Sequence, residues 1–381
     1  MKKILFAAPH FFSGFVRVGG QQYAKLLSKN NWKVIYSSNF LSPFNLLFGK
    51  NRTDIRMRFS NYLRGGENIN ENLKSHAFLT FLPHHNFTIF DRKWLLYNYY
   101  KFTFPQINKM IKKNSFKDVD VLWIDSPSQI FWKNIINFKK SIYRIPDAIE
   151  EFSKNREVII KAHEDAIHSV DTVIVTSKVL INELKEKYKN VNFLYCPNGV
   201  DLSNFIKDKY HKPDEYLDIK GKIALYVGAI GEWFDEELLL YLADNSKDIN
   251  FFIIGPDRTN KMKAIKKSNI SYLGPKEYKD VPDYMYQADF GIIPFKSTKL
   301  VRCVNPIKLY EFFSLGKQVV SVSWEELELL KSPCLLAKNS SEFLELIHSD
   351  MVIHPDHSCL TNYANRNTWE SRLRDILKLI N

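Results

Sequence analysis

KLVRCVNPIKLYEFFSLGKQVV, residues 299–320, carries the most structural information in the chain. It is typical of a loop followed by a helix, because Asn305 is a favoured helix N-cap residue and Pro306 is tolerated at the first helical position. Gly316 predicts the end of that helix, and the apolar run from Val319 predicts a buried strand. We therefore expect a short helix between two strands of an α/β sheet.

The start of that helix is suited to an anion, because its first amide groups have no partner within the helix and the helix dipole is positive there. Lys308 and Glu311 are three residues apart and so share one helix face. A cation there could meet a diphosphate, and a carboxylate could accept hydrogen bonds from ribose hydroxyls. The alternative interpretation of the two residues is a surface Lys–Glu pair on a capped helix.

Short apolar runs alternate with helical patterns in both halves of the chain, which indicates β-α units around parallel sheets. We expect two doubly wound sheets. The predicted strands are Lys3–Ala8, Trp32–Ser37, Val119–Ile124 and Thr172–Thr176 in the first half, and Lys222–Val227, Ile249–Ile254, Ile270–Leu273, Phe290–Pro294 and Val319–Val322 in the second.

The length of 381 residues favours two domains of roughly 150 to 200 residues each. Residues 195–201, YCPNGVD, form a turn-rich break, and residues 207–220 are polar and contain proline, as in a connector. We expect domains over residues 1–204 and 205–365. The apolar spacing in Asn367–Ile380 predicts a closing helix, within a third segment, 366–381, that packs back toward the first domain.

The net charge of +12, from 54 Lys and Arg against 42 Asp and Glu, should attract anions such as nucleotides, nucleic acid, lipid headgroups or acidic glycans. The four cysteines are far apart, which argues against a zinc site or a disulfide framework and favours a reduced compartment. The basic N-terminus has too short an apolar run for a signal peptide. No apolar run is long enough for a spanning helix, so any membrane contact is expected to be peripheral.

The segment from Ser42 to Lys113 does not follow the β-α rhythm and is rich in aromatic and basic residues, particularly between Arg52 and Phe102. One interpretation is a helical insertion with a solvated basic face. The other is an acceptor-side or membrane-facing surface, because Lys and Arg near anionic lipid contribute roughly 1 kcal/mol each.

The 299–320 stretch resembles the N-P-x-K-x-x-E … G-K-P-V-V block of GT-B glycosyltransferases, particularly those of teichuronic acid, capsule or exopolysaccharide assembly. Other matching segments are LYVGAIGEWFD (225–235), FIIGP (252–256), YLGP (272–275), AD (288–289), IPF (293–295) and PNGVD (197–201), together with Trp369 in a C-terminal crossover helix. The resemblance covers residues 170–381 and is weak between 40 and 115. It implies two Rossmann-like domains that face each other across a cleft.

By this resemblance, Glu311 would hold the ribose, and Lys308 and Arg302 would hold the diphosphate at the helix that Asn305 begins. The loop from Gly228 to Gly231 would approach the phosphates and the donor sugar. Two further glycines would border the base: Gly255 and Gly274.

The larger retaining family of this fold carries E-x(7)-E, but Cys303 stands eight residues before Glu311. An inverting reaction is therefore favoured, and it needs a carboxylate as general base for the acceptor hydroxyl. Asp147, in YRIPDAIEEF (143–152), resembles the Y-x-x-x-D loop of xanthan-type glucuronosyltransferases and would be that base. The alternative is a helix N-cap at Asp147, with Glu150 completing a capping box. Both roles could hold at once.

Three features near the N-terminus are further candidates. Gly19 and Gly20 precede an amphipathic helix and resemble the G-G loop that faces the donor phosphate, although a glycine pair also suits a helix start. His10 ends the first predicted strand and Asp125 follows another, so both are candidate cleft residues. Each would otherwise be structural.

The resulting hypothesis is a glycosyltransferase that moves a sugar from a nucleotide-diphosphate sugar, UDP favoured, to a lipid-linked or glycan acceptor in cell-surface polysaccharide assembly. We expect it to act in the cytoplasm at an anionic membrane surface and to have no nucleic-acid partner. We expect no cofactor and no metal, because the helix start and basic side chains would take the diphosphate charge. The alternatives are a nucleotide-sugar epimerase of the same fold and a non-catalytic protein that binds anionic surfaces.

Overall fold

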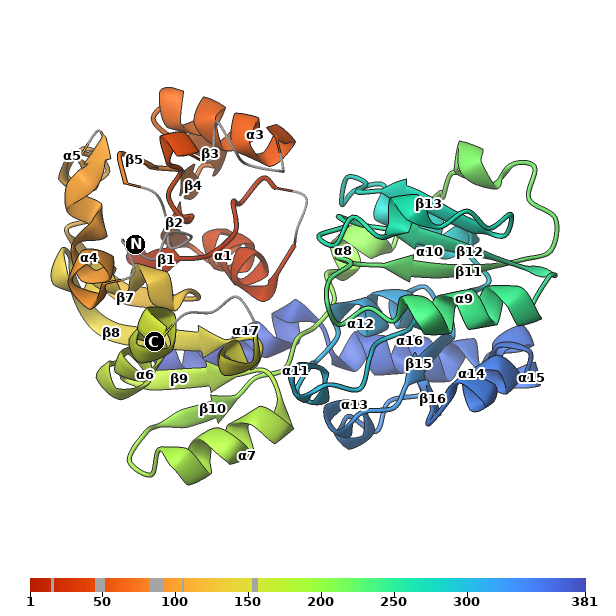
Figure 1. Cartoon of the computed structure of the whole chain (residues 1–381). Helices are drawn as coiled ribbons and strands as arrows, with labels where there is room; N and C mark the ends of the chain where they lie inside the picture. The colour runs from red at the N-terminus through yellow and green to blue at the C-terminus, as the bar shows by residue number, and fades with distance from the viewer. Residues whose placement is uncertain (15–16, 45–51, 83–91, 105, 153–156) are drawn as a thin grey trace. The chain divides into compact units, whose positions relative to one another are not determined.

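The computed structural model of the chain describes residues 1–14, 17–44, 52–82, 92–104, 106–152 and 157–381. It divides into two compact units (Figure 1). The first unit comprises Met1–Thr176, Leu180–Cys196 and Leu373–Asn381, and the second comprises Ser177–Val179 and Pro197–Arg372. The predicted connector, 207–220, lies within the second unit.

The first unit contains an eight-stranded sheet with the order β10-β9-β8-β7-β1-β2-β4-β3, parallel except for the β3–β4 pair. A separate antiparallel pair, β5–β6, lies beside it. The strands are β1 (Lys2–Ala7), β2 (Trp32–Ser37), β3 (Glu67–Asn70), β4 (Leu73–His76), β5 (Leu79–Thr80), β6 (Thr103–Phe104), β7 (Asp118–Ile124), β8 (Asn137–Ile145), β9 (Thr172–Val175) and β10 (Phe193–Tyr195).

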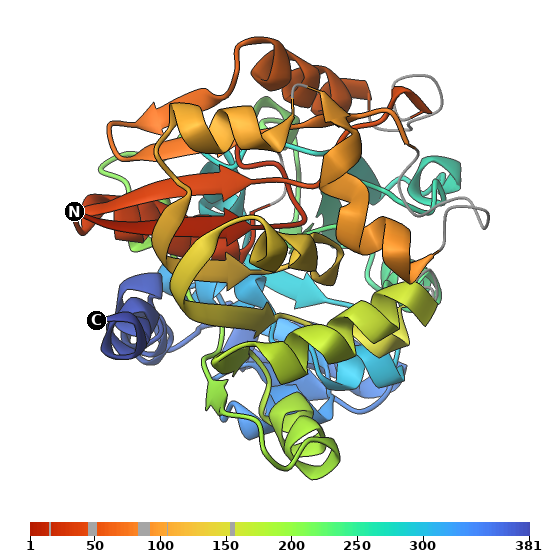
Figure 2. The same ribbon diagram turned by 90° about the vertical axis from the view of Figure 1, so that its left-hand side faces the viewer.

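The helices of the first unit alternate with its strands along the chain. They are α1 (Gly19–Lys29), α3 (Arg52–Leu63), α4 (Lys93–Asn98), α5 (Ile107–Lys113), α6 (Glu157–Ser169) and α7 (Lys178–Lys187), with 3-10 turns η2 (Tyr99–Phe102), η3 (Pro127–Asn134) and η4 (Ile149–Glu151). Figure 2 turns the view so that the parallel strands β1 and β2 are seen side by side.

The second unit contains a six-stranded parallel sheet with the order β13-β12-β11-β14-β15-β16. Its strands are β11 (Lys222–Val227), β12 (Ile249–Ile254), β13 (Ile270–Gly274), β14 (Phe290–Ile293), β15 (Val319–Val322) and β16 (Leu335–Ala337). Its helices are α8 (Leu202–Phe205), α9 (Glu236–Asn245), α10 (Val281–Gln287), α11 (Lys299–Arg302), α12 (Ile307–Ser314), α13 (Glu325–Leu329), α14 (Ser340–Ile347), α15 (Asp350–Ile353) and α16 (His357–Arg366), with turns η5 (Asp214–Tyr216) and η6 (Met262–Ala264).

Apolar side chains of this sheet and of its helices form one core, in which the strand centres are buried on both faces. Gly291 in β14 lets α12 pack closely, because a Cβ there would lie 2.7 Å from the Phe312 ring. Gly316, with a φ of +67°, ends α12 as predicted.

The closing helix is α17 (Trp369–Ile380), as expected from its apolar spacing. Its last residues group with the first unit, where Lys2 Nζ donates to Asn381 Oδ1 at 3.1 Å and Lys140 Nζ donates to the Leu379 carbonyl at 2.6 Å. Leu373 and Ile376 are buried there.

The segment 42–113 is less helical than expected. Besides α3, α4 and α5 it contains β4, which pairs in parallel with β2 and extends the main sheet, and the antiparallel neighbour β3. Parts of this segment, 45–51, 83–91 and 105, lie outside the described residues. Among the described residues, no helix is long and apolar enough to span a membrane.

Candidate active site

The sheet of the second unit reverses its strand order between β11 and β14, and ligands of open α/β sheets bind at such switch points, beyond the carboxyl ends of the strands. Three predicted glycines lie at this edge: Gly228 after β11, Gly255 after β12 and Gly274 at the end of β13. Their φ angles, +154°, +141° and +71°, are ones that glycine adopts readily. All three therefore lie at the carboxyl edge of the sheet, and their roles toward a donor stay predictions.

The loops that carry these glycines are joined through the main chain. The Gly228 amide donates to the Ile254 carbonyl at 2.9 Å, and the Gly255 amide donates to the Gly274 carbonyl at 2.9 Å. A Cβ at Gly255 would lie 1.9 Å from the Gly228 carbonyl oxygen, so a side chain there would force the loops apart. Glycine is required at 255 by close packing, and this packing fixes the position of the Gly228 loop.

Helix α12 begins at Ile307, one residue later than predicted, and Pro306 takes the N-cap position with an extended backbone. The prediction that Asn305 caps the helix is wrong. The Asn305 side chain instead accepts hydrogen bonds from the Asn198 amide at 3.3 Å and the Tyr310 hydroxyl at 3.1 Å. These buried contacts fix the backbone that leads into α12. The first amides of the helix have no side-chain cap.

Lys308, in the first turn of α12, extends to the Gly228 loop. Its Nζ lies 3.5 Å from the Tyr226 hydroxyl and 4.6 and 4.7 Å from the ring centroids of Tyr226 and Phe295. A Cβ at Gly228 would be 2.8 Å from the same Nζ. Burial lowers the pKa of the Lys308 ammonium to about 8, although the nearby Glu311 carboxylate acts to raise it. A buried ammonium held by aromatic faces is well placed to gain an anionic partner.

Glu311 lies one turn further along α12 and is 8% exposed. The Tyr278 hydroxyl donates to its Oε1 at 3.5 Å. Burial raises the pKa of the Glu311 carboxyl to about 7, the positive charge of Lys308 lowers it, and Asp201 raises it. The interpretation as a surface Lys–Glu pair is therefore wrong, because the carboxyl is buried at the carboxyl edge of the sheet.

The remaining predicted donor-binding residues, Gly231 and Arg302, contact other parts of the protein. Gly231 accepts the Phe234 amide at 3.1 Å, and a Cβ there would lie 2.6 Å from the Trp233 ring. Arg302, in α11, donates to Glu325 Oε2 at 2.8 Å, in a half-exposed ion pair. Binding of a diphosphate by Arg302 would therefore compete with Glu325.

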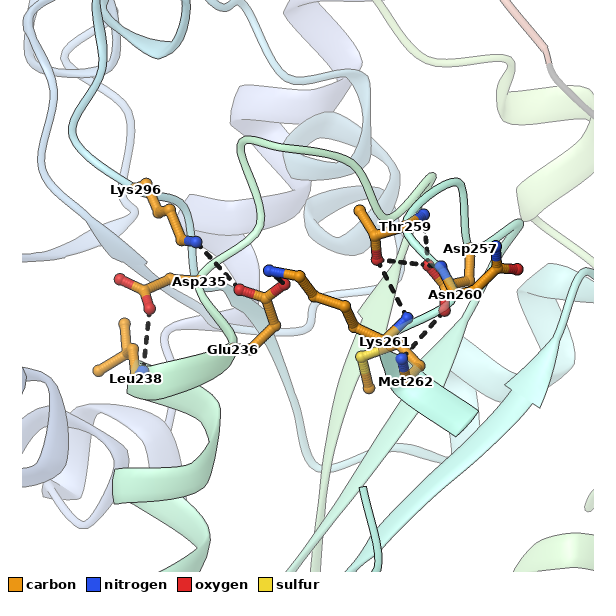
Figure 3. A network of polar contacts seen from close by, with 9 residues as sticks. All are labelled: Asp235, Glu236, Leu238, Asp257, Thr259, Asn260, Lys261, Met262 and Lys296. Atoms are coloured by element: carbon orange, nitrogen blue, oxygen red, sulfur yellow. Dashed lines mark hydrogen bonds and ion pairs between the residues drawn. The ribbon is translucent and has the colours of Figure 1, made fainter. Parts of the chain in front are cut away.

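Sequence reasoning missed the aromatic residues Tyr226, Tyr278 and Phe295, and it missed a charged network at the same edge. Figure 3 shows this network, in which Lys261 Nζ and Lys296 Nζ contact the two carboxylate oxygens of Glu236 at 2.9 and 3.0 Å. Glu236 begins α9, Lys261 lies in the segment after β12 and Lys296 in the loop after β14, so only the fold brings them together. Tyr226 and Phe295 could have been suspected, because both lie within quoted motifs, Tyr226 near the end of one predicted strand and Phe295 directly after another.

In the first unit the strand order reverses between β1 and β7. His10 follows β1 and Asp125 follows β7, and the Asp125 amide donates to the Ala7 carbonyl at 2.8 Å. Gly19 and Gly20 lie inside the first turn of α1 rather than before it, so they form the helix start. These four candidates gather at the carboxyl edge of the first sheet.

Asp125 is more buried than expected for a residue that lines a cleft. It is 5% exposed, accepts the Trp123 Nε1 proton at 2.7 Å and lies 3.9 Å from an Arg144 nitrogen. A Cβ at Gly20 would lie 1.8 Å from Asp125 Oδ2. Burial raises the pKa of this carboxyl, and Arg144 opposes the rise. Asp125 therefore supports the start of α1, where a carboxylate is favoured by the helix dipole.

Asp147 follows β8, the strand next to β7, and its side chain is only half-buried. The interpretation as a helix cap is wrong, because the N-cap of the short turn η4 is Ala148 and Glu150 pairs with Lys187 at 2.8 Å. Burial raises the pKa of the Asp147 carboxyl, and Arg144 lowers it. A raised pKa suits a general base.

No family model matches the chain. It is 27% identical over 282 residues to a protein of Bacillus subtilis named as the teichuronic acid biosynthesis glycosyltransferase TuaH, with 68% of this chain and 70% of the relative covered. Among solved structures it resembles sucrose-phosphate synthase from Thermosynechococcus elongatus, with a TM-score of 0.73, 13% identity, and 100% and 98% of the two chains covered.

It also resembles Anabaena HepE in complex with UDP-glucose, with a TM-score of 0.65, 13% identity, and 100% and 99% coverage. WaaG, a glycosyltransferase involved in lipopolysaccharide biosynthesis, has a TM-score of 0.66, 12% identity and 99% coverage of both chains. The two parallel-sheet units and these similarities confirm the fold expected from the motifs: the chain has the GT-B fold and is similar to glycosyltransferases of that fold.

Proposed function

We propose that the chain transfers a sugar from a UDP-sugar to a lipid-linked or glycan acceptor in cell-surface polysaccharide assembly. The observation that carries this is the pair Lys308 and Glu311 on α12, packed against the Gly228 loop at the sheet's switch point. The ammonium and the uncapped amides of α12 suit a diphosphate, and the buried carboxyl suits ribose hydroxyls. That Anabaena HepE, of the same fold, is seen with UDP-glucose supports UDP as the nucleotide.

The acceptor proposal draws on the name of the Bacillus subtilis relative, which refers to teichuronic acid biosynthesis. We place the reaction at the cytoplasmic face of the membrane, where a lipid-linked acceptor and the nucleotide sugar would both be present. No metal is required in this proposal, because Lys308 and the start of α12 compensate the charge that develops on the departing diphosphate.

For the chemical step we propose an inverting displacement with Asp147 as general base. Asp147 takes the proton of the acceptor hydroxyl, whose oxygen forms the new bond to the anomeric carbon. The bond from that carbon to the UDP oxygen breaks, and UDP leaves with the electron pair. Asp147 is favoured over Asp125 because Asp147 is half-buried and Asp125 is enclosed by Trp123, Arg144 and the start of α1.

Calorimetric titration with UDP-, GDP-, ADP- and CMP-sugars tests the donor assignment. UDP-sugars should bind the wild type, and Lys308→Met should lose most of that affinity while remaining folded. Glu345→Gln, on the exposed face of α14, is a control that should bind as the wild type does. Equal affinity of the wild type and Lys308→Met would remove α12 from the donor site.

A further inference from the structure

Three large aromatic side chains of the first unit are mostly exposed: Phe81 at 62%, Trp94 at 63% and Phe104 at 58%. Side chains of this size normally bury most of their surface, and apolar groups left together in water mark interaction sites. Phe81 and Phe104 belong to the separate β5–β6 pair and its end, and Trp94 belongs to α4; none of them lies in the loops that carry His10, Asp125 and Asp147. Their exposure therefore calls for an explanation apart from catalysis.

These side chains belong to two ring pairs on neighbouring segments of the chain. In β6, Thr103 is buried and Phe104 is exposed on the opposite side, and Phe102, at the end of η2, is partly exposed. The Phe81 ring lies 6.1 Å from Phe104, and the Trp94 ring lies 6.5 Å from Phe102. The Phe81 amide also donates to the Phe102 carbonyl at 3.1 Å. We call Phe81, Trp94, Phe102 and Phe104 the aromatic patch.

The charged residues of the stretch 92–117, which carries most of the aromatic patch, are all basic, and one of them, Lys93, pairs with Asp165 of α6 at 2.8 Å. From residue 92 to residue 117 the sequence contains no Asp or Glu, and its basic residues are Arg92, Lys93, Lys101, Lys109, Lys112, Lys113 and Lys117. Helix α5, which follows β6 closely, buries Ile107 and Met110 and exposes Lys109, Lys112 and Lys113. Figure 1 shows α4, β5 and α5 together on one side of the first unit.

We infer that this side of the first unit docks on an anionic lipid bilayer, with the aromatic patch inserted into the interface and the basic residues against the headgroups. Aromatic rings beside lysines are the composition of interfacial membrane anchors. A second copy of the chain fits less well, because a two-fold contact through this surface would bring like charges together. The inference rests on the proposed function, in which the acceptor is lipid-linked and lies in such a surface.

The inference predicts two separable contributions to membrane binding. Each lysine near the headgroups should strengthen binding by about fivefold at low salt, and salt should screen this contribution. The inserted rings should contribute at every salt concentration, because burial of apolar surface does not depend on ionic screening. A purely electrostatic surface would show only the first contribution.

The test is sedimentation of the full chain with phosphatidylcholine vesicles that contain or lack phosphatidylglycerol. The wild type should bind the anionic vesicles preferentially. The double substitution Phe81→Ser and Phe104→Ser should lower the partition coefficient by about tenfold or more at low and at high salt. Met351→Ser with Ile353→Ser, which removes two exposed apolar side chains from α15, is the matched control and should bind as the wild type does.

The charge contribution has its own pair of variants. Lys109→Glu with Lys112→Glu should weaken binding at low salt only, and Lys185→Glu with Lys189→Glu, at exposed positions of α7 and just beyond it, should leave binding unchanged. Trp94→Phe should keep binding but lose the blue shift of tryptophan emission that insertion of Trp94 causes.

UDP-sugar affinity, measured on every variant, separates this inference from the proposed function. Unchanged vesicle binding of the Phe81/Phe104 variant overturns the inference, and so does a wild type that binds no vesicles. Loss of self-association in that variant without an effect on vesicles overturns it in favour of a second copy. In each of these cases, unchanged UDP-sugar binding would still support the proposed donor site.

Discussion

The ionisation of Lys308 and Glu311 should give UDP-sugar binding a narrow pH optimum. Binding as proposed needs the ammonium protonated, for the diphosphate, and the carboxyl ionised, for the ribose hydroxyls. Burial lowers the pKa of Lys308 from 10.5 to about 8 and raises the pKa of Glu311 from 4.5 to about 7. The two groups are therefore both charged only in a window between these values.

The size of the effect follows from the two values. Near pH 7.5, about 60% of the molecules carry both charges, and near pH 6 or near pH 9 only about 10% do. The dissociation constant of a UDP-sugar should therefore rise about sixfold on either side of the optimum. A UDP-sugar is a better probe than UDP, because both ends of its diphosphate are esterified and do not titrate in this range.

Linkage gives the matching effect on stability. The raised pKa of Glu311 means that its contribution to folding stability is present below 4.5 and is lost as the pH rises through about 7. The lowered pKa of Lys308 means that its contribution is present above 10.5 and is lost as the pH falls through about 8. UDP-sugar should bind most tightly between about pH 7 and about pH 8, where both groups are charged. A UDP-sugar should therefore raise the thermal stability of the protein most in that range.

Isothermal calorimetry of one UDP-sugar from about pH 6 to about pH 9 measures the optimum. Glu311→Gln should abolish the acidic limb, keep the alkaline limb and weaken binding at the optimum by roughly 1.5–3 kcal/mol, the scale of a charge-assisted hydrogen bond. Glu345→Gln should change nothing. A flat profile for the wild type, or an acidic limb that survives in Glu311→Gln, would refute the assignment of both residues.

Three further substitutions test other parts of the structure. Asp147→Asn should lower turnover by about 10²–10⁴ with donor affinity nearly intact, because a general base acts in the transition state. Single-turnover transfer and the anomeric configuration of the product by NMR measure this. Near-wild-type turnover or a retained configuration would exclude Asp147 as the base. Gly255→Ala should weaken UDP-sugar binding by at least about tenfold, because its Cβ would meet the Gly228 carbonyl at 1.9 Å; calorimetry showing wild-type affinity would contradict the main-chain contact. Gly20→Ala should destabilise the chain by about 1–3 kcal/mol, because its Cβ would lie 1.8 Å from Asp125 Oδ2; an unchanged urea midpoint would show that Asp125 is not packed under α1.

Much of the fold could be predicted from the sequence where the signal is local. The strands from Lys222 to Val227 and from Ile249 to Ile254 are continuous apolar runs, and each is followed by a glycine that the turn geometry requires. The closing helix was evident from apolar spacing alone. The strand β4, Leu73–His76, was missed because its sequence, LKSH, has only one apolar residue and so carries no strand pattern of its own.

The candidate site was predictable only in part. Lys308 and Glu311 share a helix face at a motif, but their burial depends on Tyr226 and Tyr278, which come from other segments. Asn305 was misassigned because local propensity favours it as a cap, while tertiary hydrogen bonds with Asn198 and Tyr310 hold its side chain elsewhere. Side-chain partners far apart in the sequence leave no local signal.

The central claim is acceptor-dependent sugar transfer from a donor held at α12. The most direct measurement is UDP release from a UDP-sugar, by wild type and by Glu311→Gln, with and without a polyprenyl-linked acceptor. Our account predicts rapid release by the wild type only when acceptor is present, with the sugar recovered on the acceptor, and strongly reduced release by Glu311→Gln. Turnover of the UDP-sugar that is the same without acceptor, or that Glu311→Gln performs as well as the wild type, would contradict it.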